Sequence, residues 1–548
     1  MAASPDDRAA PAEPAHDAPR TSKPGGDKSN PQAESDKDAI RRNLSDKVDA
    51  SKLDEIQETL AQLRKEFNQR DFTAERDNDL EDKDFANLTK NWIGAASDNA
   101  QVVTGTLVNI HLGSGGAAAS APIEEKRPSP SEWPSSAFDA CGEDLGSVAF
   151  LLSAAVLEDS NIAHVHQSAE VLAQRLCANH ATDPQSERPP ARLRSVDSLF
   201  VAFRLTVSRE TKDDGFPVDR VSFVNAGDSA ILLMSAWTRM LGMSHWVRNL
   251  TEWLRDLGSS PSQEIRASAG RAAGLLWSFG VDRIEKEALD RWLTDSDLKP
   301  LDALDGAYST AALSSAPFRQ RINKRLRAWG HLSDGPDGVA ALVHLSTRRY
   351  RHVDLDACLQ GLEALLAQNN LAALLGAEQA YNRLLASAVD EPKLAAALTA
   401  SLLKTFDKAR QAKDEKLRIQ VIMLSLSLVN AERRKQGERY QVLDRFFDDS
   451  KEGDGNFARL LHETMAASPL QAKAVQSLRQ LFLRGAANYK GVRWRDSGVL
   501  RLFGLMYESG DARQRERLKY YLSDWINAAA RKHPAAADGL DVFRNHLN

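Results

Sequence analysis

The sequence predicts a mainly α-helical protein: an irregular α-solenoid of the HEAT or armadillo kind, with a small winged-helix-like α+β module and a disordered N-terminus. Two observations lead to this fold class. From Trp246 to Asn548, apolar residues recur at helical spacing, in sets separated by Gly and Pro. Within that half, residues 261–292 read as two helices joined by a turn, a unit that must stack on similar units to bury its apolar face.

Four segments follow from these patterns. They are a disordered tail over 1–38, a region with an amphipathic helix, a lone strand and a linker over 39–135, the winged-helix-like module over 136–241, and the solenoid over 242–548. The tail consists largely of Ala, Pro, Asp, Ser, Gly and Lys and has no aromatic residue. Such a composition cannot bury enough apolar surface to offset chain entropy, so we expect it to be disordered.

An amphipathic helix is predicted over residues 49–69. Its apolar residues follow alternating three- and four-residue steps, the pattern of a heptad seam: Leu53, Ile56, Leu60, Leu63 and Phe67. The seam is too short to establish a coiled coil. Packing on the body of the protein and weak self-association through this helix both remain open.

An extended strand is predicted over residues 101–112, which are rich in β-branched side chains and alternate in polarity. A glycine-rich linker follows. A single strand is not stable alone, so it pairs with its own kind in an oligomer, adds to a partner's sheet, or pairs locally with a later hairpin. Its candidate contact residues are Val103, Leu107, Val108 and Ile110.

The module over 136–241 is predicted from helices followed by a two-stranded wing. Two helices are expected within residues 144–178, strands at 199–207 and 219–224, and a further helix over 228–241. Winged helices often bind DNA, but a recognition helix should be basic. The expected helix over 161–176 carries no cluster of Lys or Arg, so DNA reading is disfavoured.

The unit over 261–292 is predicted in more detail than the rest of the array. Pro261 and Ser262 favour a helix start, and Gly280 favours a helix end. Gly270 and Gly274, with other small residues, predict that a neighbouring helix packs closely here. A second helix is expected from Ile284. No strand is predicted beyond Trp246.

Composition and motifs limit the function classes. The net charge of −5 does not fit a nucleic-acid polyelectrolyte, and three separated cysteines suit a reducing cytoplasm. No apolar run is long enough to span a membrane. We find no catalytic signature and expect no cofactor. His164 and His166 point apart on a helix and are not expected to bind a metal.

A basic cluster is the candidate site for phosphate or nucleic acid. Its residues occupy one predicted helix and the following element: Arg319, Arg321, Lys324, Arg325, Arg327, Arg348, Arg349 and Arg351. If the two elements meet, the cluster could hold phosphates. The favoured alternative is a solvated face neutralised by Asp334, Asp337, Asp354 and Asp356. A second basic set lies between Arg479 and Arg501.

Three features in this order carry a resemblance: the strand Val-Val-Thr-Gly-Thr-Leu-Val-Asn, the two-helix and wing module, and the helix Glu-Ile-Arg-Ala-Ser-Ala-Gly-Arg-Ala-Ala-Gly-Leu-Leu. Together they resemble the regions that flank the ATPase domain in actinobacterial STAND-type signal-transduction NTPases. The resemblance implies a restraining winged helix and a ligand-sensing repeat array. The P-loop ATPase expected between strand and wing is missing, so this would be an ATPase-less relative acting beside a separate NTPase.

The sequence therefore predicts a non-enzymatic scaffold or sensor that binds a protein partner, such as a separate NTPase or effector of a signalling or defence system. Self-association through the N-terminal helix and strand is expected to accompany this. The alternative is a nucleic-acid-binding protein that uses the basic cluster.

Overall fold

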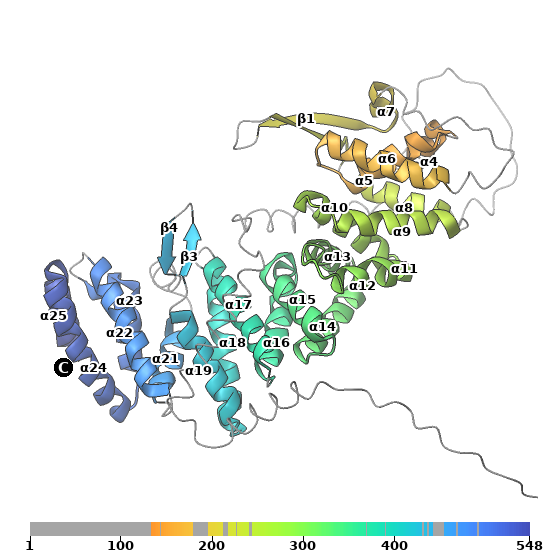
Figure 1. The fold of residues 1–548 in the computed structure, drawn as a ribbon. Coiled ribbons are helices and arrows are strands. Elements are labelled where there is room, and N and C mark those ends of the chain that lie inside the picture. Colours follow the sequence, from red (N-terminus) through yellow and green to blue (C-terminus); the bar gives the residue numbers. More distant parts are fainter. Residues whose placement is uncertain are drawn as a thin grey trace, which may run out of the picture. The chain divides into compact units, whose positions relative to one another are not determined.

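The computed structural model describes residues 133–142, 144–178, 196–211, 217–225, 227–240, 244–368, 370–388, 391–429, 432–435, 438–441, 454–466, 470–489 and 493–547. The predicted tail, the predicted helix over 49–69 and the predicted strand over 101–112 lie outside these residues, and they stay predictions. The described chain is mainly helical, as predicted, and carries two short β-hairpins (Figure 1).

The N-terminal part of the described chain combines helices with one hairpin. Its elements are α4 (Trp133–Cys141), α5 (Leu145–Val156), α6 (Ile162–Ala178), α7 (Val196–Ala202), β1 (Leu205–Thr211), β2 (Pro217–Phe223) and α8 (Asp228–Met240). α5 starts at a cap, because the Asp144 carboxylate accepts a hydrogen bond from the Gly146 amide at 3.0 Å. Both predicted helices within residues 144–178 are present, and the two strands predicted after them form the antiparallel β1–β2 hairpin.

The first strand of the hairpin was predicted too early. Residues 199–202, the beginning of the predicted strand over 199–207, form the end of α7. The Phe203 amide still donates to the Leu199 carbonyl at 2.9 Å, and Arg204 turns the chain with a left-handed φ of +54°. The apolar run is too short for periodicity to distinguish a helical turn from a strand.

The rest of the described chain is a solenoid of stacked helices. Its first elements are α9 (Ser244–Gly258), α10 (Gln263–Ser278), α11 (Asp282–Ile284), η1 (Glu285–Leu289), α12 (Asp290–Leu293), α13 (Leu301–Ser314), α14 (Ala316–Gly330), α15 (Gly335–Thr347), η2 (Arg349–His352) and α16 (Leu355–Leu366). The later ones are α17 (Leu371–Ala388), α18 (Pro392–Gln411), α19 (Glu415–Val429), β3 (Glu432–Lys435), β4 (Glu438–Gln441), α21 (Asp454–Ala466), α22 (Gln471–Asn488), η4 (Trp494–Asp496), α23 (Gly498–Ser509), α24 (Ala512–Lys532), η5 (Pro534–Ala536) and α25 (Ala537–Leu547).

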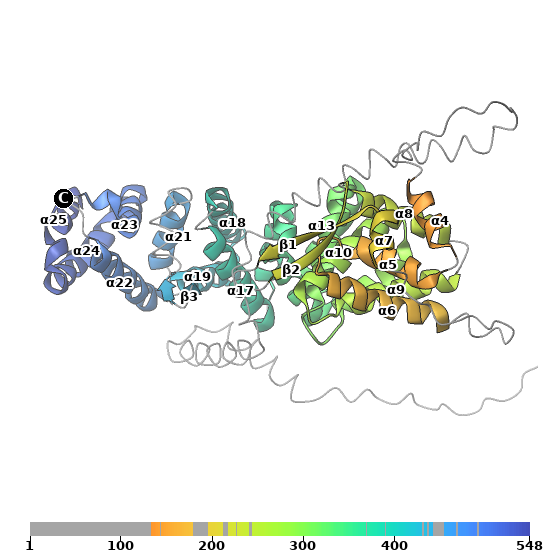
Figure 2. The same ribbon diagram turned by 90° about the horizontal axis from the view of Figure 1, so that it is seen from above.

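The contacts between these helices follow a repeating order. From α14 onward, helices pack both on the next helix and on the next but one: α14 contacts α15 and α16, α15 contacts α16 and α17, and α17 contacts α18 and α19. Figure 2 shows the same succession of short helices. Each helix pair thus buries its apolar face against its neighbours in sequence, which is how a solenoid builds a continuous core.

The closest helix packing in this array lies between α10 and α13. A Cβ atom at Gly270 would lie 2.2 Å from the carbonyl oxygen of Ala303, and one at Gly274 would lie 2.2 Å from that of Ala307. Only glycine allows the two backbones to approach so closely. The predicted close approach at the small residues of α10 is therefore confirmed.

The ends of α10 also match the prediction, whereas the helix after it is irregular. The Ser262 side chain caps α10, and Gly280 takes a φ of +89° after its end. The predicted second helix from Ile284 contains a π-helical turn, η1, flanked by the short α11 and α12. The Asp290 amide accordingly donates to the Glu285 carbonyl, five residues back.

One element beyond Trp246 contradicts the expectation of helices alone. Strands β3 and β4 pair antiparallel between α19 and α21. Their sequences, Glu-Arg-Arg-Lys and Glu-Arg-Tyr-Gln, are charged rather than β-branched, so they give no strand signal. The hairpin is short and leaves the helical order on either side intact.

Candidate partner-binding surfaces

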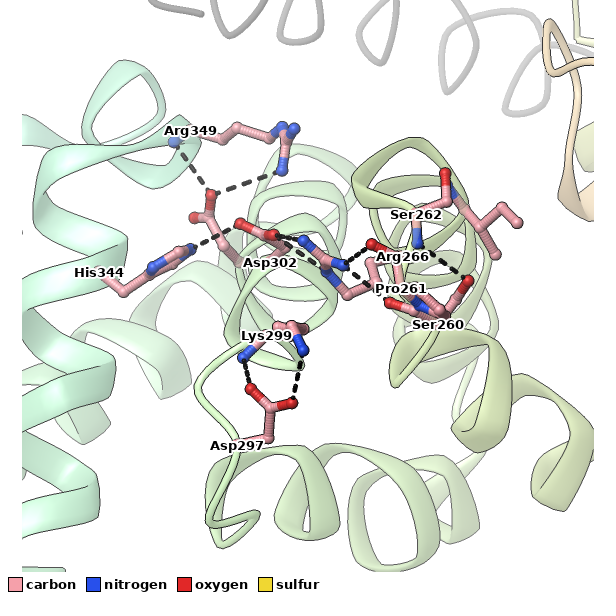
Figure 3. Close-up of polar contacts among 11 residues, drawn as sticks. Ser260, Pro261, Ser262, Arg266, Asp297, Lys299, Asp302, His344 and Arg349 are labelled. Atoms are coloured by element: carbon pink, nitrogen blue, oxygen red, sulfur yellow. Dashed lines mark hydrogen bonds and ion pairs between the residues drawn. The ribbon is translucent and has the colours of Figure 1, made fainter. Parts of the chain in front are cut away.

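A buried polar chain runs across the first units of the array. Arg266 of α10 donates to the Asp302 carboxylate of α13 through Nε at 3.0 Å and Nη2 at 2.6 Å (Figure 3). The His344 Nε2 atom of α15 lies 3.2 Å from the other Asp302 oxygen. Burial would raise the pKa of Asp302, but His344 and Arg266 outweigh it and hold that pKa below its usual range. Asp302 is therefore ionised and links three helices.

A second buried carboxylate lies one helical turn further along α13. Asp305 is fully buried and accepts hydrogen bonds from the backbone amides of Arg349 and Tyr350, each at 3.1 Å. The guanidinium of Arg349 approaches the same carboxylate at 4.0 Å. Asp305 therefore fixes η2 against α13.

These contacts decide the role of two of the eight residues in the predicted basic cluster. Arg349 and Arg351 are buried, and Arg351 pairs with Glu391 at the start of α18 at 3.2 Å. Arg348 is half-buried at the end of α15. Buried guanidinium groups that pair inside the protein do not present a surface to phosphates, so Arg349 and Arg351 hold neighbouring units together.

The remaining cations of the cluster lie on α14. The side chain of Arg321 forms an ion pair with Glu285, and Arg325 pairs with Asp290 at 2.7 Å. Arg319 donates to the Ala312 carbonyl at 3.2 Å. Of the cluster's residues on α14, only Lys324 and Arg327 are exposed and have no ion-pair partner among the described residues. The structure thus does not bring the eight predicted residues together on one surface.

Arg321 and Arg325 also cover an aromatic ladder that passes through successive helices. The rings of Trp277 and Tyr308 stack with centroids 5.6 Å apart, and those of Tyr308 and Trp329 stack at 5.9 Å. Arg321 lies over the Trp277 ring and Arg325 over the Trp329 ring. Both arginines therefore belong to the packing of the core as much as to the surface.

The acids that neutralise these cations come from distant helices. The ion-pair partners are Glu285, Asp290, Asp305 and Glu391, whereas the sequence suggested aspartates close in the chain. Asp354, one of those aspartates, instead accepts from the Asn323 side chain at 2.8 Å and caps α16. Proximity in the sequence did not predict these ion pairs, because helix stacking brings together residues about 40 positions apart.

A different basic face lies on α24, and the sequence reasoning missed it. Arg513, Arg517 and Tyr520 occupy one side of the helix, opposite the buried Leu518, Leu522 and Trp525. Tyr520 is 75% exposed, the second most exposed of the large apolar side chains in the described chain. Among the described residues, neither Arg513 nor Arg517 has an ion-pair partner. The signal was present as Arg-x-x-x-Arg-x-x-Tyr at helical spacing.

The second predicted basic set does not form a comparable face. Trp494 is buried and carries the Arg495 guanidinium over its ring, and Arg484 donates to the Val429 carbonyl at 3.1 Å. Arg479 pairs with Asp524 of α24 at 3.6 Å. This last contact places Arg479 beside the α24 face, which we define as Arg513, Arg517 and Tyr520.

The N-terminal module joins the array through buried polar groups. The Glu158 carboxylate, in the turn after α5, accepts a hydrogen bond from Ser229 of α8. Arg271 of α10 donates to the Glu158 carbonyl at 3.3 Å. Burial raises the pKa of Glu158, and Arg271 and Ser229 only partly oppose this. The buried carboxyl is thus a pH-sensitive point in the junction.

The described residues bring no group of three or more candidate metal ligands together. The His166 ring packs beside that of Phe150, with centroids 5.1 Å apart. Within the same part of the chain, none of the helices combines the length and hydropathy that crossing a bilayer requires.

Comparisons with known proteins add little to this geometry. No protein-family model matches the chain, and no curated protein matches it. One similar solved structure comes from a study of how Kap95p binding induces the switch loops of RanGDP to adopt the GTP-bound conformation. The identity is 11% and the TM-score is 0.26, over 76% of this chain and 53% of that chain. This chain therefore spans about half the length of that one, at a similarity too low to inform function.

Proposed function

We propose that this chain is a helical-repeat scaffold that binds a protein partner, and that the α24 face is its main contact. The observation that carries the proposal is the exposed Tyr520 beside Arg513 and Arg517. Tyr and Arg are the residue types most enriched where binding energy concentrates in protein interfaces. Elsewhere in the described array the arginines are largely engaged in packing and ion pairs.

The positive charge of this face favours a partner that carries carboxylates. Two guanidinium groups that form no ion pair with the described residues favour a carboxylate-bearing segment, because Arg binds carboxylates with two parallel hydrogen bonds. An acidic segment with an apolar or aromatic residue would contact both the arginines and the Tyr520 ring. The net charge of −5 for the whole chain favours this class over an extended nucleic acid.

The resemblance to STAND-type NTPases suggests a class of partner. In this proposal the chain works in the cytoplasm as an accessory of a signalling or defence system, and the partner is a separate NTPase or effector. Self-association through the predicted helix over 49–69 is compatible with this role. The chain itself would not hydrolyse ATP, so ATP turnover by the purified protein would count against the proposal.

Two charge-reversal variants test the surface. Arg513→Glu with Arg517→Glu alters the α24 face, and Lys324→Glu with Arg327→Glu makes the same charge change on the exposed part of α14. Partners enriched from the native host with the unaltered protein should be lost with the first variant and kept with the second. Equal retention by both variants would refute the assignment of the face.

The same pair addresses the alternative function. If the chain binds nucleic acid through α14, a salt titration with RNA and DNA should show binding at low salt that the Lys324→Glu and Arg327→Glu variant loses. No binding at low salt by the unaltered protein would eliminate that alternative.

A further inference from the structure

The outer edge of strand β1 is open in the described chain. β1 pairs with β2 in antiparallel register, with Val207 opposite Val221. The Val221 amide donates to the Ser160 carbonyl at 3.0 Å, and the Val221 carbonyl accepts from the Asp159 amide at 2.8 Å. Both groups of Val221 therefore point away from β1, and the turn after α5 covers that edge of β2.

This register determines which backbone groups of β1 are available. In an antiparallel pair, residues opposite each other alternate between exchanging both hydrogen bonds and exchanging none. Val221 forms its backbone hydrogen bonds with the turn after α5, so the pair of Val207 and Val221 exchanges none. The pair of Arg209 and Asp219, two residues along, exchanges none either. The amide and carbonyl of Val207 and Arg209 accordingly point outward, where no described residue pairs with them. Such a row of groups is a template for another strand.

Exposed apolar side chains lie on β1 and at the base of the hairpin. Val201, Val207 and Val224 are 83%, 46% and 59% exposed, and they are three of the few large apolar side chains exposed in the described chain. The backbone brings Val201 and Val224 together at the base of the hairpin, because both bond to Arg204. Apart from Leu205, the side chains of β1 are exposed. Among the described residues, therefore, no element covers the exposed side chains of β1, and none forms hydrogen bonds with its outer edge.

We propose that residues 101–112 of the same chain bind this edge as a third strand, antiparallel to β1. The segment reads Gln-Val-Val-Thr-Gly-Thr-Leu-Val-Asn-Ile-His-Leu, and its β-branched residues suit the uncovered valines. Val102, Thr104, Thr106, Val108, Ile110 and Leu112 share one face. This choice selects local pairing from the three fates that the sequence left open for the strand.

The connection favours this occupant and this direction. The described chain begins at Trp133, whose ring packs edge-on against Phe223 with centroids 5.9 Å apart. Phe223 is opposite Leu205, so the chain enters beside the first residue of β1. An antiparallel third strand would end at that same place. The 20 residues over 113–132 reach at most about 66 Å when extended, more than enough for the short return. The tether also gives the segment a higher effective concentration than a second copy.

Hydrogen exchange with mass spectrometry on the full chain tests the proposal. The amides of Val207 and Arg209 and those of the 101–112 segment should exchange at least about tenfold more slowly than unstructured amides. Thr106→Pro with Val108→Pro removes two donors from the segment and should abolish the protection of Val207 and Arg209. The amides of Thr206 and Ser208, which face β2, should stay protected. Because the prolines lie outside the described fold, the melting temperature of the array should not change.

Two matched measurements keep the result unambiguous. Ala117→Pro with Ala119→Pro places the same two substitutions in the linker and should leave the exchange of β1 unchanged. Diluting the protein tenfold should also leave it unchanged. Protection that falls on dilution would show a second copy on the edge and overturn the assignment. Random-coil exchange of the segment in the unaltered protein would overturn it as well, and neither outcome bears on the α24 face.

Discussion

Gly274 of α10 lies directly against the backbone carbonyl of Ala307 on α13. A Cβ atom at this position would be 2.2 Å from that oxygen, and the neighbour is main chain, which cannot move aside as a flexible side chain would. The contact sets the separation of the two helices that pack most closely in the array. It also explains why α10 carries Gly in the middle of a helix, where Gly is otherwise unfavourable.

Replacing this glycine should destabilise the array. Gly274→Val forces the helices apart, and we expect a loss of about 3 kcal/mol in the free energy of unfolding. Urea unfolding followed by circular dichroism measures it. Gly455→Ala is the control, because nothing lies within 4 Å of a Cβ atom there. A Gly274→Val protein as stable as the control would refute the close packing.

Removing the charge of Asp302 should expose the cost of a buried unpaired arginine. Asp302→Asn leaves Arg266 without its counter-ion, and we expect a loss of about 3–5 kcal/mol at pH 7. The additional replacement Arg266→Met should restore much of it. If the double variant is no more stable than Asp302→Asn, the two residues do not act as a pair.

The pH dependence of the same pair has a defined sign. The pKa of Asp302 is lower in the folded than in the unfolded protein, so its contribution is complete above the unfolded value of about 3.9 and is lost as the pH falls below it. The stability gap between the unaltered protein and Asp302→Asn should therefore shrink as the pH falls from about 5 to 3. Melting temperatures across that range measure it.

Glu158 should show the opposite sign. Burial raises its pKa, so its contribution is present at low pH and is lost as the pH rises through the folded value. Glu158→Gln keeps an acceptor for Ser229 but no longer titrates. The variant should gain stability relative to the unaltered protein as the pH rises from 4 to 8. A difference that is flat with pH, or of the other sign, would contradict the burial of a charged carboxyl at this junction.

Replacing buried and exposed residues of the basic cluster should change the free energy of unfolding by different amounts. Arg351→Ala removes the partner of Glu391 and should cost about 3–5 kcal/mol, whereas Lys324→Ala should stay within about 0.5 kcal/mol. Chemical denaturation of the two variants provides the comparison. Equal stabilities would show that Arg351 is not part of the core.

Local patterns predicted the elements better than the contacts between them. The start and end of α10, the close approach at its glycines and the helices within 144–178 could all be predicted, because capping, residue size and periodicity act within a few residues. The partners of Arg321 and Arg351 could not, since they lie about 40 positions away and meet only through stacking. The β3–β4 hairpin could not be predicted because its charged residues carry no alternation. The α24 face could not be predicted because the sequence alone does not show which arginines pair with acids of other helices.

The ion pairs that cross between units restrict how this protein can be divided. Arg266 ties α10 to α13, Asp305 ties α13 to η2, and Arg351 ties η2 to the start of α18. A fragment cut between α13 and η2 would separate the buried Asp305 carboxylate from the backbone amides of η2 and from the Arg349 guanidinium. Deletion, duplication or exchange of single repeats, which more regular arrays tolerate, should therefore fail in this stretch, and truncations that end after α18 should be the soluble ones.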